Sequence, residues 1–210
     1  MKLYSYFRSS AAFRVRIALN LKALAYDTQA VHLVKNEQQL ADYQALNPSQ
    51  LVPTLMDADQ PLLQSISILE YLEEAYPAIA LLPTDLVDRA QVRAFAQAIA
   101  CDIHPLNNLR VLKYLQHELA LDDTQKNHWY QHWIIEGFRS LEAQLGQSNG
   151  QFCFGTQATF ADCCLIPQVY NAKRFKVDLS GFPKIESIYQ HCMALPAFHQ
   201  AAPEQQPDWE

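Results

Sequence analysis

Two patterns of apolar and polar residues divide this chain. In the first third, short apolar runs alternate with segments at helical spacing, such as Phe13, Ile17 and Leu21, which lie four residues apart. The predicted elements are a strand over 2–7, a helix over 10–22, a strand over 26–33, a short helix over 37–45, a hairpin over 54–57 and 61–64, and a helix capped by Ser65. The predicted order is therefore β-α-β-α-β-β-α.

A different pattern follows residue 85. The segment from Tyr76 to Asp85 has no regular period and contains two prolines, so it is predicted to link two domains. Beyond it, one long helix is predicted through Val92, Phe95, Ile99 and Ile103, and another through Trp133, Ile134, Phe138, Leu141 and Leu145. Thr159 and Asp162 have capping-box spacing ahead of an apolar run. We expect a mixed α+β domain over 1–80 and an all-α domain over 86–210.

The composition bears on the class of function. A chain of 210 residues, half of them hydrophobic, can bury the core of a soluble enzyme. The net charge of −6 argues against a nucleic-acid partner, and the five glycines form neither a P-loop nor a GxGxxG motif. No apolar run approaches membrane-spanning length. The five cysteines lack CxxC spacing, which suits free thiols in a reducing compartment, so we expect a cytoplasmic protein with no membrane partner.

A metal site is the weaker interpretation of one histidine pattern. His128, His132 and Glu136 recur every four residues and could share a helix face. No further ligands converge with them in the sequence, and a solvated helix face explains the same spacing. We predict no metal.

The clearest chemical signal is the serine pair Ser9 and Ser10, which stands between a predicted strand and a predicted helix. A hydroxyl at a helix N-terminus lies where the helix dipole favours an anion, so it can hydrogen-bond a thiolate and keep it ionised. The next residue is Ala11 and the nearest cysteine is Cys101, so the thiol would come from a cofactor such as glutathione. The structural alternative is that Ser9 is a turn residue and Ser10 only an N-cap.

Other residues could take or share that role. Tyr4 and Tyr6 could supply a hydroxyl, but both lie in a predicted strand, of which one side must face the core. Val52 and Pro53 predict a cis-proline. Taken together, the residues favour a site that activates a thiol, with a serine as the donor.

These motifs together resemble the zeta class of glutathione transferases, which contains maleylacetoacetate and maleylpyruvate isomerases. The resemblance runs from end to end and rests on motifs in a fixed order: Tyr4 to Arg8, Ser9 and Ser10, Arg14 to Leu19, Leu46 to Pro48, Val52 and Pro53, Gln64 and Ser65, Glu70 to Glu74, and Arg174 to Leu179. It implies a thioredoxin-like N-terminal domain that binds glutathione, an all-helical C-terminal domain that binds substrate, and a homodimer.

The resemblance also assigns glutathione-binding residues. It implies that Ser9, with Ser10 beside it, stabilises the glutathione thiolate, and that the main chain of Val52, ahead of Pro53, pairs with the cysteinyl part. Gln64 and Ser65 would hold the γ-glutamyl end.

The second domain would close the site. The resemblance places His104, Asn108 and Arg110 on the long first helix of that domain, with His104 and Asn108 contacting the cofactor. Arg8, Arg110 and Arg174, with His104, are the candidates for binding substrate carboxylates, although Arg174 could instead cap its helix C-terminus and His104 could be a structural histidine. Arg14 and Arg16 are expected to make structural ion pairs or a dimer contact.

The implied reaction is glutathione-dependent cis–trans isomerisation of a maleyl diacid, such as maleylacetoacetate or maleylpyruvate, in the breakdown of aromatic compounds including tyrosine. Two alternatives stay open: conjugation of glutathione to small electrophiles such as α-halo acids, and a non-catalytic binding protein of the same fold. Eukaryotic members usually have Cys after the serine pair, where this chain has Ala11, and His104 and Arg110 resemble bacterial maleylpyruvate-type enzymes.

Overall fold

The chain forms two compact units in the computed structural model, which describes residues 1–146 and 150–210. The first unit comprises Met1–Leu82 together with Met193–Glu210, and the second comprises Pro83–Cys192. The boundary between Leu82 and Pro83 falls inside the predicted linker. The C-terminal end differs from the predicted helical domain of 86–210, because Met193–Glu210 belongs with the first unit.

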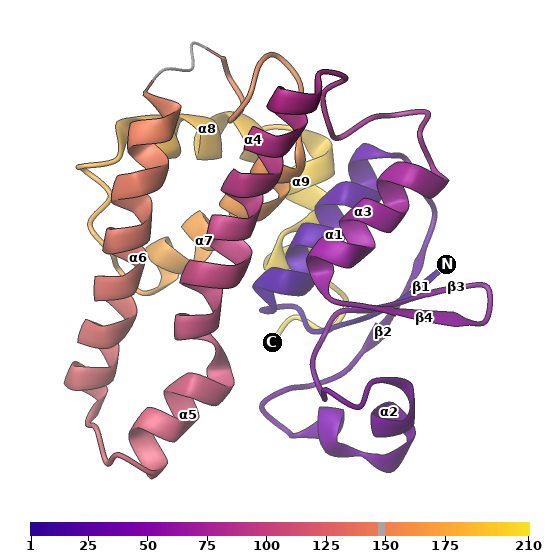
Figure 1. Ribbon diagram of the computed structural model, residues 1–210. Helices are drawn as coiled ribbons and strands as arrows, with labels where there is room; N and C mark the ends of the chain where they lie inside the picture. Colours follow the sequence, from indigo (N-terminus) through magenta and orange to yellow (C-terminus); the bar gives the residue numbers. More distant parts are fainter. Residues whose placement is uncertain (147–149) are drawn as a thin grey trace. The chain divides into compact units, whose positions relative to one another are not determined.

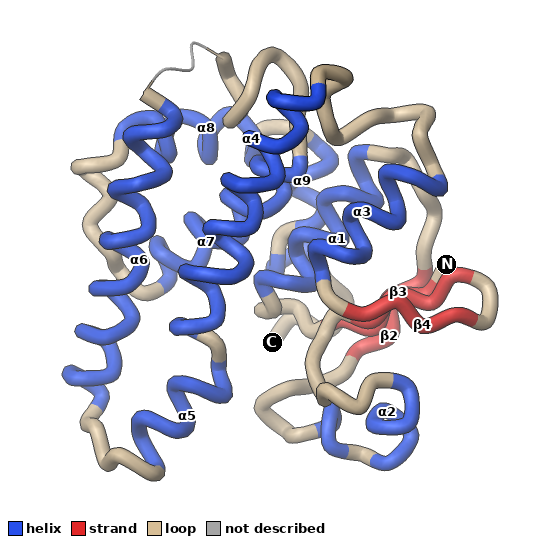
Figure 2. Tube along the Cα trace, viewed as in Figure 1, coloured by secondary structure: helices blue, strands red, loops and turns tan. Residues whose placement is uncertain are grey.

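The first unit is built on a four-stranded mixed sheet (Figures 1 and 2). Its strands β1 (Lys2–Ser5), β2 (Asp27–Ala30), β3 (Thr54–Asp57) and β4 (Gln60–Leu63) lie in the order β2-β1-β3-β4. β1 is parallel to β2 and antiparallel to β3. Helices α1 (Ser10–Leu21) and α3 (Ser65–Ala75) lie on one side of this sheet, and α2 (Ala41–Leu46), after a 3-10 turn at Glu37–Gln39, lies on the other. The predicted β-α-β-α-β-β-α order is confirmed.

The C-terminal segment joins this unit through α1. Helix α9 (Pro196–Ala201) packs against α1, and the 3-10 turn η4 (Pro203–Gln205) follows it. The Arg16 Nε donates to the Ala201 carbonyl at 2.8 Å, and the Asn20 amide donates to the Ala197 carbonyl at 2.9 Å. These contacts explain why residues 193–210 belong with the sheet.

A buried ion pair fixes the end of the first unit. The Lys22 ammonium lies 2.8 Å from a Glu73 carboxylate oxygen and also donates to the carbonyls of Tyr76 and Ile79. The same carboxylate accepts the amides of residues 81 and 82. The first half of the predicted linker is therefore bound to α1 and α3.

The described residues of the second unit are mainly helical. Its helices are α4 (Leu86–Gln97), α5 (Leu109–His117), α6 (Asp123–Leu145), α7 (Phe160–Arg174) and α8 (Pro183–Met193), the last ending at the boundary with the first unit. The prediction of one long helix through Ile103 is wrong, because a π-helical turn occupies Ala98–Ile103 and a 3-10 turn follows at His104–Asn107. Pro105 lacks an amide and its ring would crowd the carbonyl of Cys101 in a regular α-helix, which disfavours its continuation there.

Other predictions for this unit are confirmed. The helix through Trp133 and Leu145 is α6, and the capping box is present at the start of α7. The Asp162 carboxylate accepts from the Thr159 amide at 2.8 Å and from the Cys153 amide at 2.8 Å. All five cysteines are free. Within the described residues, no helix is both long and apolar enough to cross a membrane.

Candidate active site

Ser9 caps α1. After β1, the chain turns so that the Ser9 amide donates to the Tyr6 carbonyl at 2.9 Å. The Ser9 Oγ accepts the Ala12 amide at 3.2 Å, which makes Ser9 the N-cap and Ser10 the buried first residue of the helix. The alternative in which Ser10 is the cap is therefore wrong. Because the Ser9 oxygen acts as acceptor in this bond, its O–H can donate to an anion at the positive end of α1.

The predicted cis-proline lies near this turn. The Val52–Pro53 bond is cis, and Pro53 immediately precedes β3. In the sheet, Thr54 pairs with Tyr4 of β1 on one side and with Leu63 of β4 on the other. The end of β1, the Val52–Pro53 pair and the residues after Leu63 therefore meet at one end of the sheet. No described residue hydrogen-bonds to the Val52 main chain.

Gln64 and Ser65 follow β4 at this same end. Gln64 has φ 65° and ψ 119°, a conformation that non-glycine residues seldom adopt and that is concentrated at functional sites. It occupies the N-cap position without a side-chain cap bond, so the prediction that Ser65 caps α3 is wrong; Ser65 is the first helical residue. The Ser65 Oγ accepts from Arg14 Nη1 at 3.1 Å, which ties α1 to the start of α3.

Two buried arginines hold this framework together. Arg14 and Arg16 are 2% and 0% exposed, and they bond inside the first unit. The Arg16 guanidinium donates to the Ser5 hydroxyl at 3.0 Å and to the Phe7 carbonyl at 3.1 Å, and its burial lowers its pKa to about 10. Both arginines are structural, but their acceptors are hydroxyl and carbonyl oxygens and not the carboxylates of the expected ion pairs.

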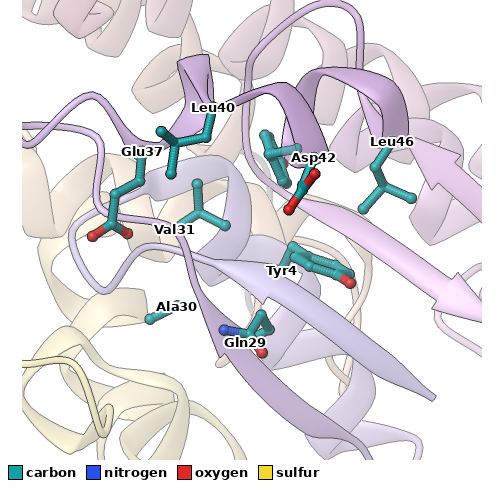
Figure 3. A pocket seen from close by; sticks show the side chains of 9 residues that line it. Tyr4, Gln29, Ala30, Val31, Glu37, Leu40, Asp42 and Leu46 are labelled. Carbon is teal, nitrogen blue, oxygen red and sulfur yellow. The ribbon is translucent and has the colours of Figure 1, made fainter.

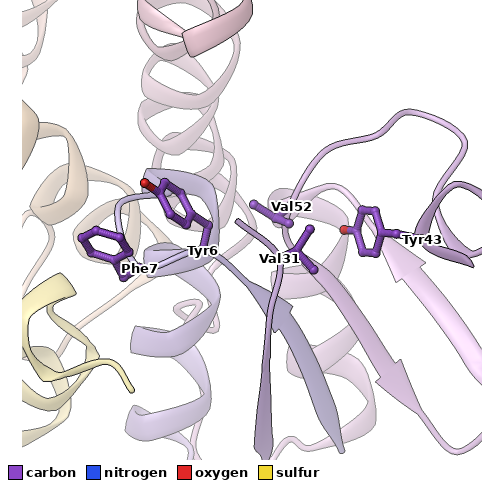
Figure 4. Close-up of a cluster of buried hydrophobic side chains, with 5 residues drawn as sticks. All are labelled: Tyr6, Phe7, Val31, Tyr43 and Val52. Atoms are coloured by element: carbon purple, nitrogen blue, oxygen red, sulfur yellow. The ribbon is translucent and has the colours of Figure 1, made fainter. Parts of the chain in front are cut away.

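A buried hydrophobic cluster includes residues from the turn before Ser9 and from Val52 (Figure 4). Its members are Tyr6, Phe7, Val31, Tyr43 and Val52. The Tyr6 ring centroid lies 4.7 Å from that of Phe7. Tyr6 is only 4% exposed, and Tyr4 packs against this cluster. The packing agrees with a core role for both tyrosine rings and leaves the serine as the preferred donor.

A separate cavity of about 510 Å³ opens between the sheet and α2 (Figure 3). Tyr4, Val31, Asp42 and Leu46 are among its lining residues. None of the predicted site residues lines it. The candidate site at the end of the sheet is therefore distinct from this cavity.

The second unit holds the remaining predicted residues around the break after α4. Asn108 caps α5, because its Oδ1 accepts the Arg110 amide at 3.1 Å. The Asn108 Nδ2 lies 3.5 Å from the His104 Nε2. Arg110 is exposed in the first turn of α5. These three residues are brought together by the 3-10 turn and not, as predicted, by a continuous helix.

Arg174 and Arg8 each lie beside an aromatic ring. Arg174 is exposed in the last turn of α7, where a cation is favoured by the helix dipole, and its guanidinium is 4.7 Å from the Phe175 ring centroid. Burial raises the pKa of the neighbouring Tyr130 to about 12, while Arg174 acts in the opposite direction. Arg8, in the first unit, is exposed and lies 4.8 Å from the Phe7 centroid.

Asn107 is a residue that sequence reasoning missed. It is 8% exposed, and neither its amide nitrogen nor its amide oxygen has a hydrogen-bond partner among the described residues. A buried unpaired amide costs free energy unless something satisfies it. No sequence signal distinguishes Asn107 from its neighbour Asn108. The 3-10 turn is what buries Asn107, and this turn was not predicted from the sequence. No group of three or more metal-binding side chains occurs in residues 1–146 and 150–210.

Comparison with known proteins identifies the family to which this chain belongs. Residues 1–74 match the family model of the glutathione S-transferase N-terminal domain. A probable maleylacetoacetate isomerase of Vibrio cholerae is 52% identical over 98% of this chain and 97% of its own length. A maleylpyruvate isomerase of a Ralstonia species is 48% identical over 99% of both chains. The chain belongs to the zeta class of glutathione transferases.

Solved structures of this class agree with the fold. The holo structure of a maleylpyruvate isomerase, described as a bacterial zeta-class glutathione transferase, has a TM-score of 0.98 at 48% identity and covers all of both chains. A Methylobacterium extorquens maleylacetoacetate isomerase with bound malonate and glutathione has a TM-score of 0.96 at 38% identity over all of both chains. The predicted glutathione transferase fold is confirmed, and its thioredoxin-like part is the sheet unit.

The residues of this zeta-class chain fit glutathione. A peptide-like ligand needs main-chain partners and a carboxylate site, and both are present at one end of the sheet. The unpaired main chain of Val52 can bond a peptide group, and the first amides of α3, beginning at Ser65, can bind a carboxylate. The Ser9 Oγ accepts the Ala12 amide, which leaves its hydroxyl hydrogen able to donate to a thiolate.

Proposed function

We propose that this protein is a glutathione-dependent isomerase that converts a maleyl diacid, maleylacetoacetate or maleylpyruvate, to its fumaryl isomer. The observation that carries this proposal is Ser9, whose hydroxyl caps α1 at the end of the sheet where the cis-proline and the Gln64–Ser65 pair also lie. The names of the full-length relatives support the same reaction.

The cofactor would be held by main-chain and hydroxyl groups. Val52 would pair through its main chain with the cysteinyl part of glutathione, and Gln64 and Ser65 would bind the γ-glutamyl carboxylate. The bond from Arg14 fixes the Ser65 oxygen at 3.1 Å, so the Ser65 amide and hydroxyl are oriented before any ligand arrives. Ser10 would support the turn beside Ser9, while His104 and Asn108 would contact the cofactor from the second unit.

Bound glutathione supplies a thiolate that adds reversibly to the cis double bond and permits rotation about it. A free thiol has a pKa near 8.5, and lowering it by about two units requires roughly 2.7 kcal/mol. A hydrogen bond to a charged group contributes about 1.5–3 kcal/mol and a helix dipole about 0.3–1 kcal/mol. The Ser9 hydroxyl and the N-terminus of α1 can therefore supply the required stabilisation together.

Arginines would bind the substrate and stabilise the charge that develops on its oxygens. A guanidinium fork matches a carboxylate in two parallel hydrogen bonds. Arg110 makes no side-chain hydrogen bond to a described residue, and its exposure leaves the fork accessible. Arg8 and Arg174 are the other candidates, with His104 as a further contact. A cationic pocket favours an enediolate-like transition state as well as the dianionic substrate.

We also propose that the protein acts as a homodimer in the cytoplasm, as the zeta-class resemblance and the free cysteines suggest.

The competing function is conjugation of glutathione to small electrophiles such as α-halo acids. The two reactions differ in the fate of the thiol, because isomerisation returns glutathione and conjugation consumes it. Free thiol should be measured while the protein turns over a maleyl diacid or an α-halo acid. Constant thiol during conversion of the diacid supports the isomerase, whereas loss of thiol equal to the substrate consumed supports conjugation.

A further inference from the structure

The C-terminal segment of the chain returns to the turn that carries Ser9. After α9, the buried Gln206 side chain donates to the carbonyls of Gln200 and Ala202, each at 2.9 Å. These bonds close the chain into a compact turn and direct the last residues toward the end of β1. Figure 4 shows this yellow segment passing beside Phe7, at the base of the turn.

The peptide groups of Phe7 are held from two sides. The Phe7 amide donates to the Asp208 Oδ2 at 3.0 Å, across 201 positions of sequence. The Phe7 carbonyl accepts from the buried Arg16 at 3.1 Å, and Arg16 also donates to the carbonyl of Ala201 in α9. Both polar main-chain groups of a residue only two positions before Ser9 are therefore fixed by side chains.

Glu210, two residues after Asp208, makes a second and weaker contact within the first unit. The Glu210 carboxylate is 2.7 Å from the Lys35 ammonium and 3.3 Å from the His32 Nε2. The His32 ring centroid lies 4.9 Å from that of Tyr6, at the start of the same turn. Lys35 and Glu210 are more than half exposed, so this pair contributes little. The Asp208 bond is the one that constrains the turn.

We propose that Asp208 is a positioning residue for thiol activation: it fixes the Phe7 peptide and thereby places the Ser9 hydroxyl on the bound thiol. This inference rests on the proposed function of Ser9. Its physical basis is that a donor must lie within hydrogen-bond distance of the thiolate, and displacement by about 1 Å can reduce a rate by up to a hundredfold. The side chains of α9 that pack against α1 would remain in place without Asp208.

The test compares Asp208→Ala with Asp208→Asn and with a matched control, Asp59→Ala. Asn keeps an oxygen that can accept the Phe7 amide, so it should restore most of the wild-type behaviour. Asp59 lies in the exposed turn between β3 and β4 and makes no side-chain hydrogen bond to a described residue. Each variant is measured for hydrogen exchange at the Phe7 amide without ligand, for glutathione binding by calorimetry, and for the pKa of the bound thiol by thiolate absorbance.

Asp208→Ala should lose protection of the Phe7 amide and raise the pKa of the bound thiol by about one unit. The thiolate fraction at pH 7 would then fall about threefold, and kcat at that pH with it. Glutathione affinity should change less than about twofold, because Val52, Gln64 and Ser65 are untouched. Unchanged thiol pKa and kcat, with the Phe7 amide unprotected, would overturn the positioning role. Failure of the wild-type protein to bind glutathione would instead overturn the proposed function.

Discussion

Replacing Glu73 with Ala removes the acceptor at the centre of a buried network in the first unit. The Glu73 carboxylate accepts from Lys22 at 2.8 Å and from the amides of Leu81 and Leu82 at 2.9 and 3.1 Å. The Lys22 and Glu73 side chains are 1% and 7% exposed. Both charged groups are therefore shielded from bulk solvent, and the Lys22 ammonium stays buried when the carboxylate is removed.

The expected loss of stability follows from these contacts. Breaking a buried ion pair by removing one partner costs about 3–5 kcal/mol, because the other charge stays buried. The two amides add to this cost, while the carbonyls of Tyr76 and Ile79 still bind the Lys22 ammonium and reduce it. We expect a loss of about 4 kcal/mol, a large share of the 5–15 kcal/mol typical of a folded protein.

Urea unfolding followed by circular dichroism measures this loss. With a slope of about 2 kcal/mol per molar urea, the midpoint for the first unit should fall by about 2 M. Glu74→Ala is the matched control, since Glu74 is the exposed neighbour on the same helix, and it should change the midpoint little. Glu73→Gln keeps one acceptor oxygen, so its urea midpoint should lie between those of Glu73→Ala and Glu74→Ala. A loss below about 1 kcal/mol for Glu73→Ala would refute the reasoning.

Three further predictions concern the site and the pH dependence. Ser9→Gly should raise the pKa of the bound thiol by about one to two units, because the hydroxyl donor is lost. The α1 cap should lose only a few tenths of a kcal/mol, because Gly is tolerated at an N-cap. A pH titration of thiolate absorbance measures the thiol pKa, and an unchanged value would contradict the role of Ser9. Arg110→Ala should raise KM for the maleyl diacid by about tenfold and leave glutathione affinity unchanged, with the exposed Arg139→Ala as control; an equal effect of both variants on KM would argue against a carboxylate contact. Tyr76→Phe should destabilise the protein at pH 7, because the Tyr76 hydroxyl lowers the pKa of Asp57 from its usual 3.8. The difference in urea midpoint between wild type and variant should shrink as the pH falls below 3.8, where Asp57 becomes protonated. A constant difference in midpoint from pH 7 to 3 would count against the coupling of stability to Asp57 protonation.

Local patterns in the sequence predicted the elements of the first unit well. The helix predicted over 10–22 is observed at Ser10–Leu21, and the cis-proline lies where it was predicted. These features depend on neighbouring residues: a four-residue apolar period and a turn signal before proline. For the same reason, Ser9 could be found as a candidate for thiol activation.

Long-range contacts were not predictable in the same way. Residues 193–210 have helical composition, and long-range bonds attach them to the sheet unit: those of Arg16 and Asn20 to α9, and that of the Phe7 amide to Asp208. Periodicity also cannot distinguish an α-helix from the π turn that ends at Ile103. The cap of α3 was misplaced by one residue, because the unusual backbone of Gln64 is set by its position after β4.

The most direct measurement is the ultraviolet absorbance of maleylpyruvate and of maleylacetoacetate with the purified protein, in the presence and absence of glutathione. The proposed function predicts conversion to the fumaryl isomer only when glutathione is present, with the faster substrate identifying the preferred acyl chain. No conversion of either substrate by protein that binds glutathione would contradict the isomerase function.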